Sequence, residues 1–142
     1  MNRVTAAAAL GALALLSACA TPHSGPTTKP VGVAALHGKE WTIFEINGQP
    51  TIPDVKATIN FEDGRVFGAG SCNRFMGSYT ATGGFNIKLG QMASTMMACP
   101  EPAMQQEGKL LGALQAVTSF SLGADGVLTL STADGQTVKA RR

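Results

Sequence analysis

Several short segments of the chain alternate between apolar and polar residues, as half-buried strands do. In residues 55–62 every odd-numbered position is apolar and every even-numbered position is polar. Successive side chains of a strand point to opposite faces of a sheet, so this period of two predicts antiparallel strands with one buried face. The same alternation is found in residues 85–89, 119–122 and 128–130.

Segment 41–46 is less regular. Trp41 and Ile43 would share one face of a strand, whereas Phe44 and Ile46 would lie on the other. A bulge or burial on both sides would explain this pattern. Turn sequences containing glycine separate the predicted strands, and Asp-Gly pairs accept the positive φ that tight hairpins require. These turns are residues 62–65, 82–84, 124–126 and 133–135.

One segment has a helical pattern instead. Pro100 and Glu101 suit a helix N-terminus. Apolar residues then recur at helical spacing, which predicts a helix over residues 101–117 with one face on the sheet. They are Met104, Leu110, Leu111, Leu114 and Val117 or Thr118. The fold class predicted from these elements is α+β and β-rich: a small, strongly bent antiparallel sheet or barrel, with one helix inserted before the last three strands.

The N-terminal residues predict export. Arg3 is followed by an apolar run at 4–16 that is too short to cross a bilayer as a stable helix. The run ends in Leu16-Ser17-Ala18-Cys19, which resembles a bacterial lipobox. We therefore expect residues 1–18 to be a lipoprotein signal peptide and Cys19 to be the lipidated residue. The residue after Cys19 is Ala20. Many lipoproteins that stay in the inner membrane have an aspartate at this position, so we expect an outer-membrane anchor.

Residues 19–38 are rich in Thr, Pro and Gly and predict a flexible tether. The folded domain is then expected over residues 39–142, long enough for one modest core. The chain carries a formal net charge of +2 and has no long basic run. This composition argues against nucleic acid as a partner. The basic C-terminal residues 139–142 are interpreted as a solvated end.

Two cysteines remain once Cys19 is assigned to lipid. In an oxidising compartment Cys72 and Cys99 are expected to form a disulfide. In the chain-entropy model such a bond contributes about 3–4 kcal/mol to stability.

The sequence also resembles the META domain family, the fold of the HslJ-like heat-shock lipoproteins. The resemblance covers roughly residues 39–131 and includes Trp41, Asn47-Gly48 and Glu107. Met96 departs from it, since relatives often carry a basic residue there. The most specific matches are Gly68, Cys72, Asn73, Gly77 and Tyr79 in one block, and Thr95, Met97, Ala98, Cys99 and Pro100 in a second.

The resemblance implies a compact β-rich domain with one helix, found in envelope lipoproteins linked to stress or antibiotic tolerance. It implies no catalytic residues. From the residues themselves, Gly68 and Gly70 indicate close strand approach or a kink, and Asn73 is expected to adopt left-handed geometry and bond local backbone groups. Gly77 then lets the chain continue as a strand. With Cys72 joined to Cys99, the segment is predicted to be a structural joint.

Enzymatic function is not expected. The histidines of the chain are His23, in the predicted tether, and His37, at the domain edge, so no histidine is available inside the domain for nucleophilic catalysis. No cofactor is predicted. The alternative is a soft-metal site for Cu(I) built from Met92, Met96 and Met97 with the two cysteines, although methionine is also a routine core residue. A third hypothesis is that a binding surface or small apolar cavity takes an envelope protein or an apolar ligand.

Overall fold

A computed structural model describes residues 32–142 of the chain. The predicted signal peptide, Cys19 and most of the predicted tether lie outside these residues. The elements are η1 (Val33–Leu36), β1 (Trp41–Ile46), β2 (Gln49–Pro50), β3 (Ala57–Glu62), β4 (Arg65–Ala69), β5 (Arg74–Gly83), β6 (Asn86–Ser94), α1 (Glu101–Gln115), β7 (Val117–Leu122), β8 (Leu128–Thr132) and β9 (Thr137–Arg141).

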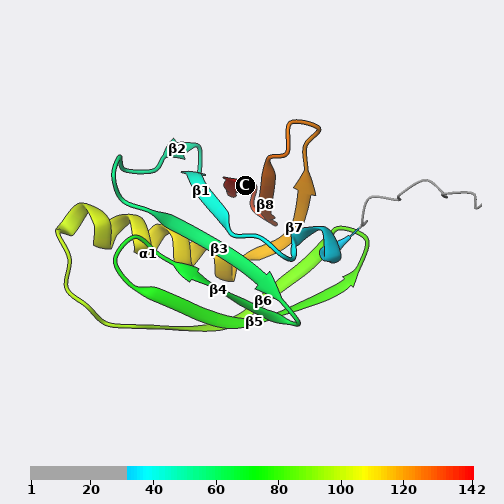
Figure 1. Ribbon diagram of the computed structural model, residues 1–142, viewed down its shortest axis with the longest axis horizontal. Helices are drawn as coiled ribbons and strands as arrows, with labels where there is room; N and C mark the ends of the chain where they lie inside the picture. The colour runs from blue at the N-terminus through cyan, green and yellow to red at the C-terminus, as the bar shows by residue number, and fades with distance from the viewer. Residues whose placement is uncertain (1–31) are drawn as a thin grey trace, which may run out of the picture.

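In the described residues, eight antiparallel strands close into a barrel, accompanied by one extra strand and one inserted α-helix (Figure 1). The sheet order is β2-β1-β3-β4-β5-β6-β7-β8-β9, and β1 also pairs with β9 to complete the circle. The predicted β-rich fold with a helix before the last three strands is confirmed. Of the two predicted forms, a strongly bent sheet or a barrel, the structure has the barrel, because β1 pairs with β9.

The predicted hairpins are present. Asp63 and Gly64 connect β3 to β4 with φ values of 47° and 80°, which is the backbone of a tight two-residue turn. The strand predicted from residue 55 begins at Ala57, because Val55 lies in a turn and donates its backbone N–H to the carbonyl of Ile52. Phe85, predicted to face the core, is 50% exposed in the β5–β6 turn and packs edge-on against Phe120.

The irregular pattern of residues 41–46 corresponds to a bulge. The register of β1 against β9 shifts between Ile43 and Glu45. Trp41, Ile43 and Ile46 are buried in the core. Phe44 lies outside that set, with the guanidinium of Arg141 at 4.1 Å from its ring centroid. The extra residue thus lets both faces of the strand carry aromatic side chains.

The helix is shorter than predicted, and its buried face includes the predicted Leu110 and Leu114 but not Met104. It ends at Gln115, and Val117 begins β7. Met104 is 40% exposed, so this predicted core position is wrong, whereas Leu111 is partly buried and packs against the core. The helix packs against β6, β9 and β1. Its buried residues are Ala103, Gln106, Glu107, Leu110, Ala113 and Leu114.

Both ends of the domain are more firmly attached than predicted. Leu36 is fully buried and its carbonyl accepts a hydrogen bond from the Trp41 indole at 3.0 Å. Arg142 lies over the Trp41 ring at 4.0 Å and donates to the carbonyl of Ala35 at 2.7 Å. The fold therefore starts near residue 33, inside the predicted tether. At the other end residues 137–141 form β9 of the barrel, while Arg141 and Arg142 remain exposed.

The barrel interior is filled with side chains. The largest fully buried ones come from the strands, from η1 and from α1, so the described core is a packed interior. In the part of the chain that the structure describes, no helix is both long and apolar enough to cross a bilayer. The largest fully buried side chains are Phe61, Phe75, Leu36, Ile43, Ile59, Ile87, Leu110, Leu114, Leu128, Leu130, Val66 and Val117.

Candidate functional site

Glu107 is a buried carboxylate that organises the loop between β4 and β5. Its side chain is on the inner face of α1, and the residue is only 6% exposed. The carboxylate accepts hydrogen bonds from the backbone N–H of Cys72 at 3.0 Å and of Asn73 at 2.6 Å. It also accepts one from the Asn73 side-chain amide at 2.8 Å. Charge-assisted hydrogen bonds of this kind are the strong ones, so the helix holds the loop at a fixed point.

The Asn73 side chain is also hydrogen-bonded to the segment that follows β6. Its Oδ1 accepts hydrogen bonds from the Thr95 hydroxyl at 2.9 Å and from the Met97 backbone N–H at 2.6 Å. Its Nδ2 also donates to the Met97 carbonyl at 3.3 Å. Three parts of the chain therefore meet at one amide: the β4–β5 loop, residues 95–97 and α1.

The expected left-handed backbone at Asn73 is wrong. The residue of the loop with positive φ is Ser71, at 118°. The Ser71 hydroxyl accepts a hydrogen bond from Nε2 of Gln106 at 2.7 Å. The Oε1 atom of Gln106 in turn accepts a hydrogen bond from the backbone N–H of Ile52 at 2.7 Å. Asn73 bonds to distant segments because its side chain points across the joint and not along its own loop.

A disulfide joins Cys72 to Cys99, with a Cα–Cα distance of 5.9 Å. The predicted pairing is therefore present in the structure. Because Cys99 stands two residues before Glu101, the bond ties the β4–β5 loop to the start of α1. It acts beside the Glu107 and Asn73 network and joins the same parts of the chain.

The glycines of this region allow close packing. A Cβ at Gly68 would overlap the carbonyl oxygen of Thr58 on β3, and one at Gly70 would lie 2.6 Å from the Glu107 carboxylate. A Cβ at Gly77 would lie 2.8 Å from the carbonyl oxygen of Gln91 on β6. A side chain at any of these positions would push neighbouring segments apart. The predicted role of this segment as a structural joint agrees with this geometry.

Tyr79 and His37 form a separate pair. The Tyr79 hydroxyl and the His37 Nε2 are 2.6 Å apart, and the two rings meet edge to face. Tyr79 also packs edge-on against Phe61 in the core. His37 thus belongs to the fold, and its contact is a tyrosine hydroxyl rather than a nucleophilic Ser or Cys.

Hydrogen bonding also decides the charge state of Glu107. Burial raises the pKa of this carboxyl, but the hydrogen bonds from Asn73 and Cys72 outweigh burial and leave the pKa below its ordinary value of 4.5. The carboxylate form is therefore the one that the folded domain favours. Its stabilising contribution is fully present above pH 4.5, the ordinary value, and is lost as the pH falls through the lower folded-state pKa.

We expect Glu107→Gln to flatten the acid dependence of stability. Urea midpoints measured from neutral to acidic pH should fall less steeply in this variant, because its amide does not titrate. Glu40, which bonds Lys56, and Asp134, which bonds Thr132, also have lowered pKa values and titrate in both proteins. Their contributions cancel in the comparison. The control is Glu101→Gln, an exposed position on the same helix; equal pH profiles for all three proteins would refute this role of Glu107.

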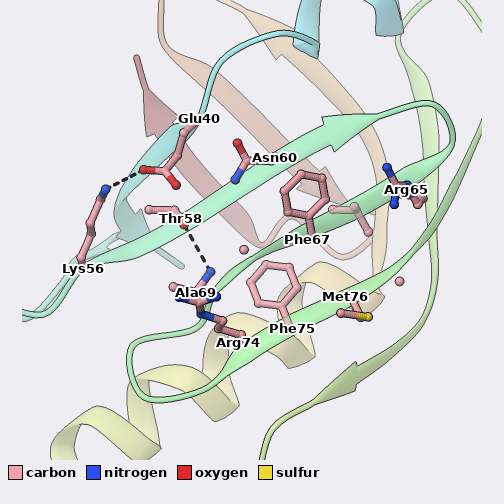
Figure 2. Close-up of a pocket in the computed structure, with 13 residues that line it drawn as sticks. Glu40, Lys56, Thr58, Asn60, Arg65, Phe67, Ala69, Arg74, Phe75 and Met76 are labelled. Carbon is pink, nitrogen blue, oxygen red and sulfur yellow. Dashed lines mark hydrogen bonds and ion pairs between the residues drawn. The ribbon is translucent and has the colours of Figure 1, made fainter.

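An open groove of about 810 Å³ lies on the outer face of β3, β4 and β5. Its volume is within the roughly 300–1,000 Å³ range of small-molecule sites. Figure 2 shows Phe67 at its centre, with Arg65 to one side and Ala69 and Arg74 to the other. This groove was not predicted from the sequence. Its lining is Glu40, Lys56, Thr58, Asn60, Arg65, Val66, Phe67, Gly68, Ala69, Arg74, Phe75, Met76 and Gly77.

Strand register explains why these side chains gather. Phe67 is paired with Asn60 on one side and with Met76 on the other, and Ala69 is paired in the same way with Thr58 and Arg74. Each set of three crosses the sheet as a row on its outer face. Met76 is 65% exposed and Phe67 is half-buried, so an apolar strip runs across the strands in contact with solvent. Exposed apolar patches of this kind often mark binding sites.

Cationic side chains surround the strip. Lys56 forms an ion pair with Glu40 at 2.5 Å, and Arg65 lies 3.5 Å from Glu62. In residues 32–142 the guanidinium of Arg74 makes no hydrogen bond or ion pair, although the Arg74 backbone is bonded to Thr95. One cation of the groove is therefore free to meet an anion.

The soft-metal alternative loses two of its ligands in this structure. The sulfurs of Cys72 and Cys99 are bonded to each other, so neither is a thiolate. Met92 packs against the core, whereas Met96 is 97% exposed and Met97 is also exposed. Within residues 32–142, no three His, Cys, Asp or Glu side chains are grouped in a way that could hold a metal ion.

Comparison with known proteins gives a family and a fold. The family model described as "META domain" matches residues 34–142. A protein from Burkholderia xenovorans, solved by NMR, is 26% identical with a TM-score of 0.62, over 77% of this chain and 84% of that one.

Two more distant structures share the fold alone. A second NMR structure is 23% identical with a TM-score of 0.61, over 75% of this chain and 92% of its own. A crystal structure of a DUF4847 family protein from Bacteroides vulgatus is 15% identical with a TM-score of 0.59, over 76% of this chain and 94% of its own. The comparison with curated proteins gives no match.

Proposed function

This chain belongs to the META domain family, and we propose that it is a non-enzymatic lipoprotein that acts through the groove on β3, β4 and β5. Cys19 would carry the lipid anchor in the outer membrane, with the domain facing the periplasm. The groove would bind a small apolar ligand or an envelope protein. The biological role would be envelope maintenance or tolerance of stress or antibiotics.

The exposed apolar strip carries this proposal. Met76 and Phe67 present apolar surface to solvent on a face that the barrel fold does not need to bury. The barrel interior is filled, so the outer groove is a better place for a ligand than the interior cavity considered from the sequence. Binding through a preformed concave surface needs no titrating side chain at its centre.

A binding role fits the chemistry of the groove better than catalysis does. The lining carboxylate of Glu40 is engaged by Lys56, and hydrogen bonding lowers its pKa, which is the opposite of what a general acid requires. His37 faces Tyr79 away from the groove lining. The Glu40 carboxylate is therefore suited to holding charge, not to transferring a proton.

Complementation in the native host tests the proposal. A deletion strain should lose growth under envelope stress, such as heat or detergent, and the wild-type gene should restore it. Met76→Asp and Phe67→Ser should fail to restore growth at unchanged protein level, because a charge or a hydroxyl interrupts the apolar strip. Cys19→Ser should also fail through loss of the anchor.

The matched control is Lys88→Gln, an exposed cation on β6 outside the groove lining. This variant should restore growth fully. Full restoration by both Met76→Asp and Phe67→Ser would exclude the groove as the functional surface.

A further inference from the structure

The backbone N–H and C=O groups beneath the groove are already hydrogen-bonded within the sheet. β4 is hydrogen-bonded along its whole length, to β3 on one side and to β5 on the other. The Thr58 hydroxyl is used as well, since it accepts the N–H of Ala69 at 3.2 Å (Figure 2). An extended peptide laid on this floor would find no free backbone partner, unlike a peptide added to a sheet edge. Its own N–H and C=O groups would be desolvated without compensation.

A hydrocarbon chain has no N–H or C=O groups that need hydrogen-bond partners. It gains from covering Phe67 and Met76 and has no polar group to satisfy along its length. The groove also crosses the strands as an open strip, and its apolar residues are adjacent in the sheet register. The floor therefore favours an acyl chain over a peptide.

Charge selects the head group. Arg74 and Met76 are two residues apart on β5 and project to the same outer face, about 7 Å apart along the strand. The other groove cations are engaged by Glu40 and Glu62, whereas the Arg74 guanidinium is free within the described residues. A planar guanidinium binds a carboxylate through two parallel hydrogen bonds. An anionic head at Arg74 would place an attached chain over Met76 and Phe67.

We propose that the groove binds a single long-chain fatty carboxylate, with its head group at Arg74 and its chain across Met76 and Phe67. This inference rests on the proposed function and names the ligand class of the same groove. The ligand would be taken up without covalent change to either molecule.

Photo-crosslinking tests the proposal on the full-length protein in cells that produce it. A palmitate analogue with a diazirine in its chain is supplied, cells are irradiated, and the protein is digested and mapped by mass spectrometry. The adducts should fall on the peptides between Lys56 and Met76. The matched probe is the corresponding diazirine alcohol, which keeps the chain and lacks the charge; we expect about tenfold less labelling from it.

Two variants separate the head group from the chain. Arg74→Gln should lower palmitate labelling to the level of the alcohol, and Met76→Asp should abolish labelling by both probes. Lys88→Gln should label as the wild type does. Met76 and Arg74 are exposed, so both variants should fold, and formation of the Cys72–Cys99 disulfide in the same digest verifies this.

The outcomes distinguish the ligand from the function. Equal labelling by the two probes, labelling that maps outside the groove, or labelling unchanged in Met76→Asp would overturn the fatty-carboxylate proposal. If Met76→Asp loses stress tolerance while palmitate does not label the groove, the groove is functional but its ligand is of another class, such as a protein partner. If groove variants keep full tolerance, the proposed function itself fails, whatever the crosslinking result.

Discussion

Replacing Glu107 with alanine is expected to lower the free energy of unfolding by about 2–4 kcal/mol. The variant leaves the backbone N–H groups of Cys72 and Asn73, and the Asn73 amide, without their acceptor in a buried place. A buried donor without a partner costs about 1–3 kcal/mol, and these three share the loss. It also opens a void beside Gly70, which packs directly against the carboxylate. Urea unfolding at neutral pH measures the difference.

The comparison variant is Glu101→Ala. Glu101 is exposed on the same helix and bonds only Gln105 at 2.8 Å among the described residues. Its replacement should change stability by less than about 0.5 kcal/mol. Glu107→Gln should lie between the two, since it keeps one acceptor oxygen and loses the charge. A Glu107→Ala protein as stable as the Glu101→Ala protein would show that the network contributes nothing to stability.

Removal of the disulfide is the second large effect. The double variant Cys72→Ser and Cys99→Ser should lose about 3–4 kcal/mol, the amount that the chain-entropy model gives for a loop of this size. The sequence separation of the two cysteines is 27 residues. Chemical reduction of the wild-type protein should produce the same shift in the urea midpoint. A midpoint that does not move on reduction would show that the bond is not needed for stability.

The two effects should not add. The disulfide holds residue 72 to residue 99, and the Glu107 and Asn73 network holds residues 72 and 73 to α1 and to residues 95–97. Each cross-link limits how far the loop can move when the other is removed. Combining Glu107→Gln with the cysteine variant should therefore give a coupling energy of about 0.5–3 kcal/mol in a double-mutant cycle. A coupling energy of zero would mean that the two cross-links act independently.

The local elements of the fold were predictable from the sequence, because their causes are local. The Asp63-Gly64 turn and the alternation before it depend on backbone preference and on burial of one face, both visible in a few residues. The sequence did not distinguish a closed barrel from an open bent sheet, because the closing pair, β1 and β9, joins segments from opposite ends of the domain. Local alternation does not specify which strands become neighbours.

The joint and the groove differ in what the sequence could show. Gly68, Asn73 and Cys72 were identified as parts of a joint, but its central carboxylate was assigned no role. Glu107 lies on the same helical stripe as Ala103, Leu110 and Leu114, and a charged residue within an apolar stripe indicates a buried partner. The helical face was predicted correctly at Leu110 and Leu114 but wrongly at Met104, which is apolar yet exposed.

The groove needed the strand register. The tight turn at residues 63–64 sets Glu62 opposite Arg65, and counting back from it places Asn60 beside Phe67 and Thr58 beside Ala69. The outer rows on β3 and β4 were thus within reach of the sequence. The Met76 and Arg74 positions were not, because the loop between β4 and β5 is shaped by the disulfide and by contacts from α1.

Pairing of β1 with β9 has a consequence for biosynthesis. β9 spans Thr137–Arg141, so the ring of strands cannot close on β1 until this strand has been synthesised. Contacts between segments so distant in sequence form late and slowly. Before β9 is present, β1 and β8 each expose an edge with unpaired backbone groups, so a chain cut short of residue 137 is expected to associate with other strands instead of closing.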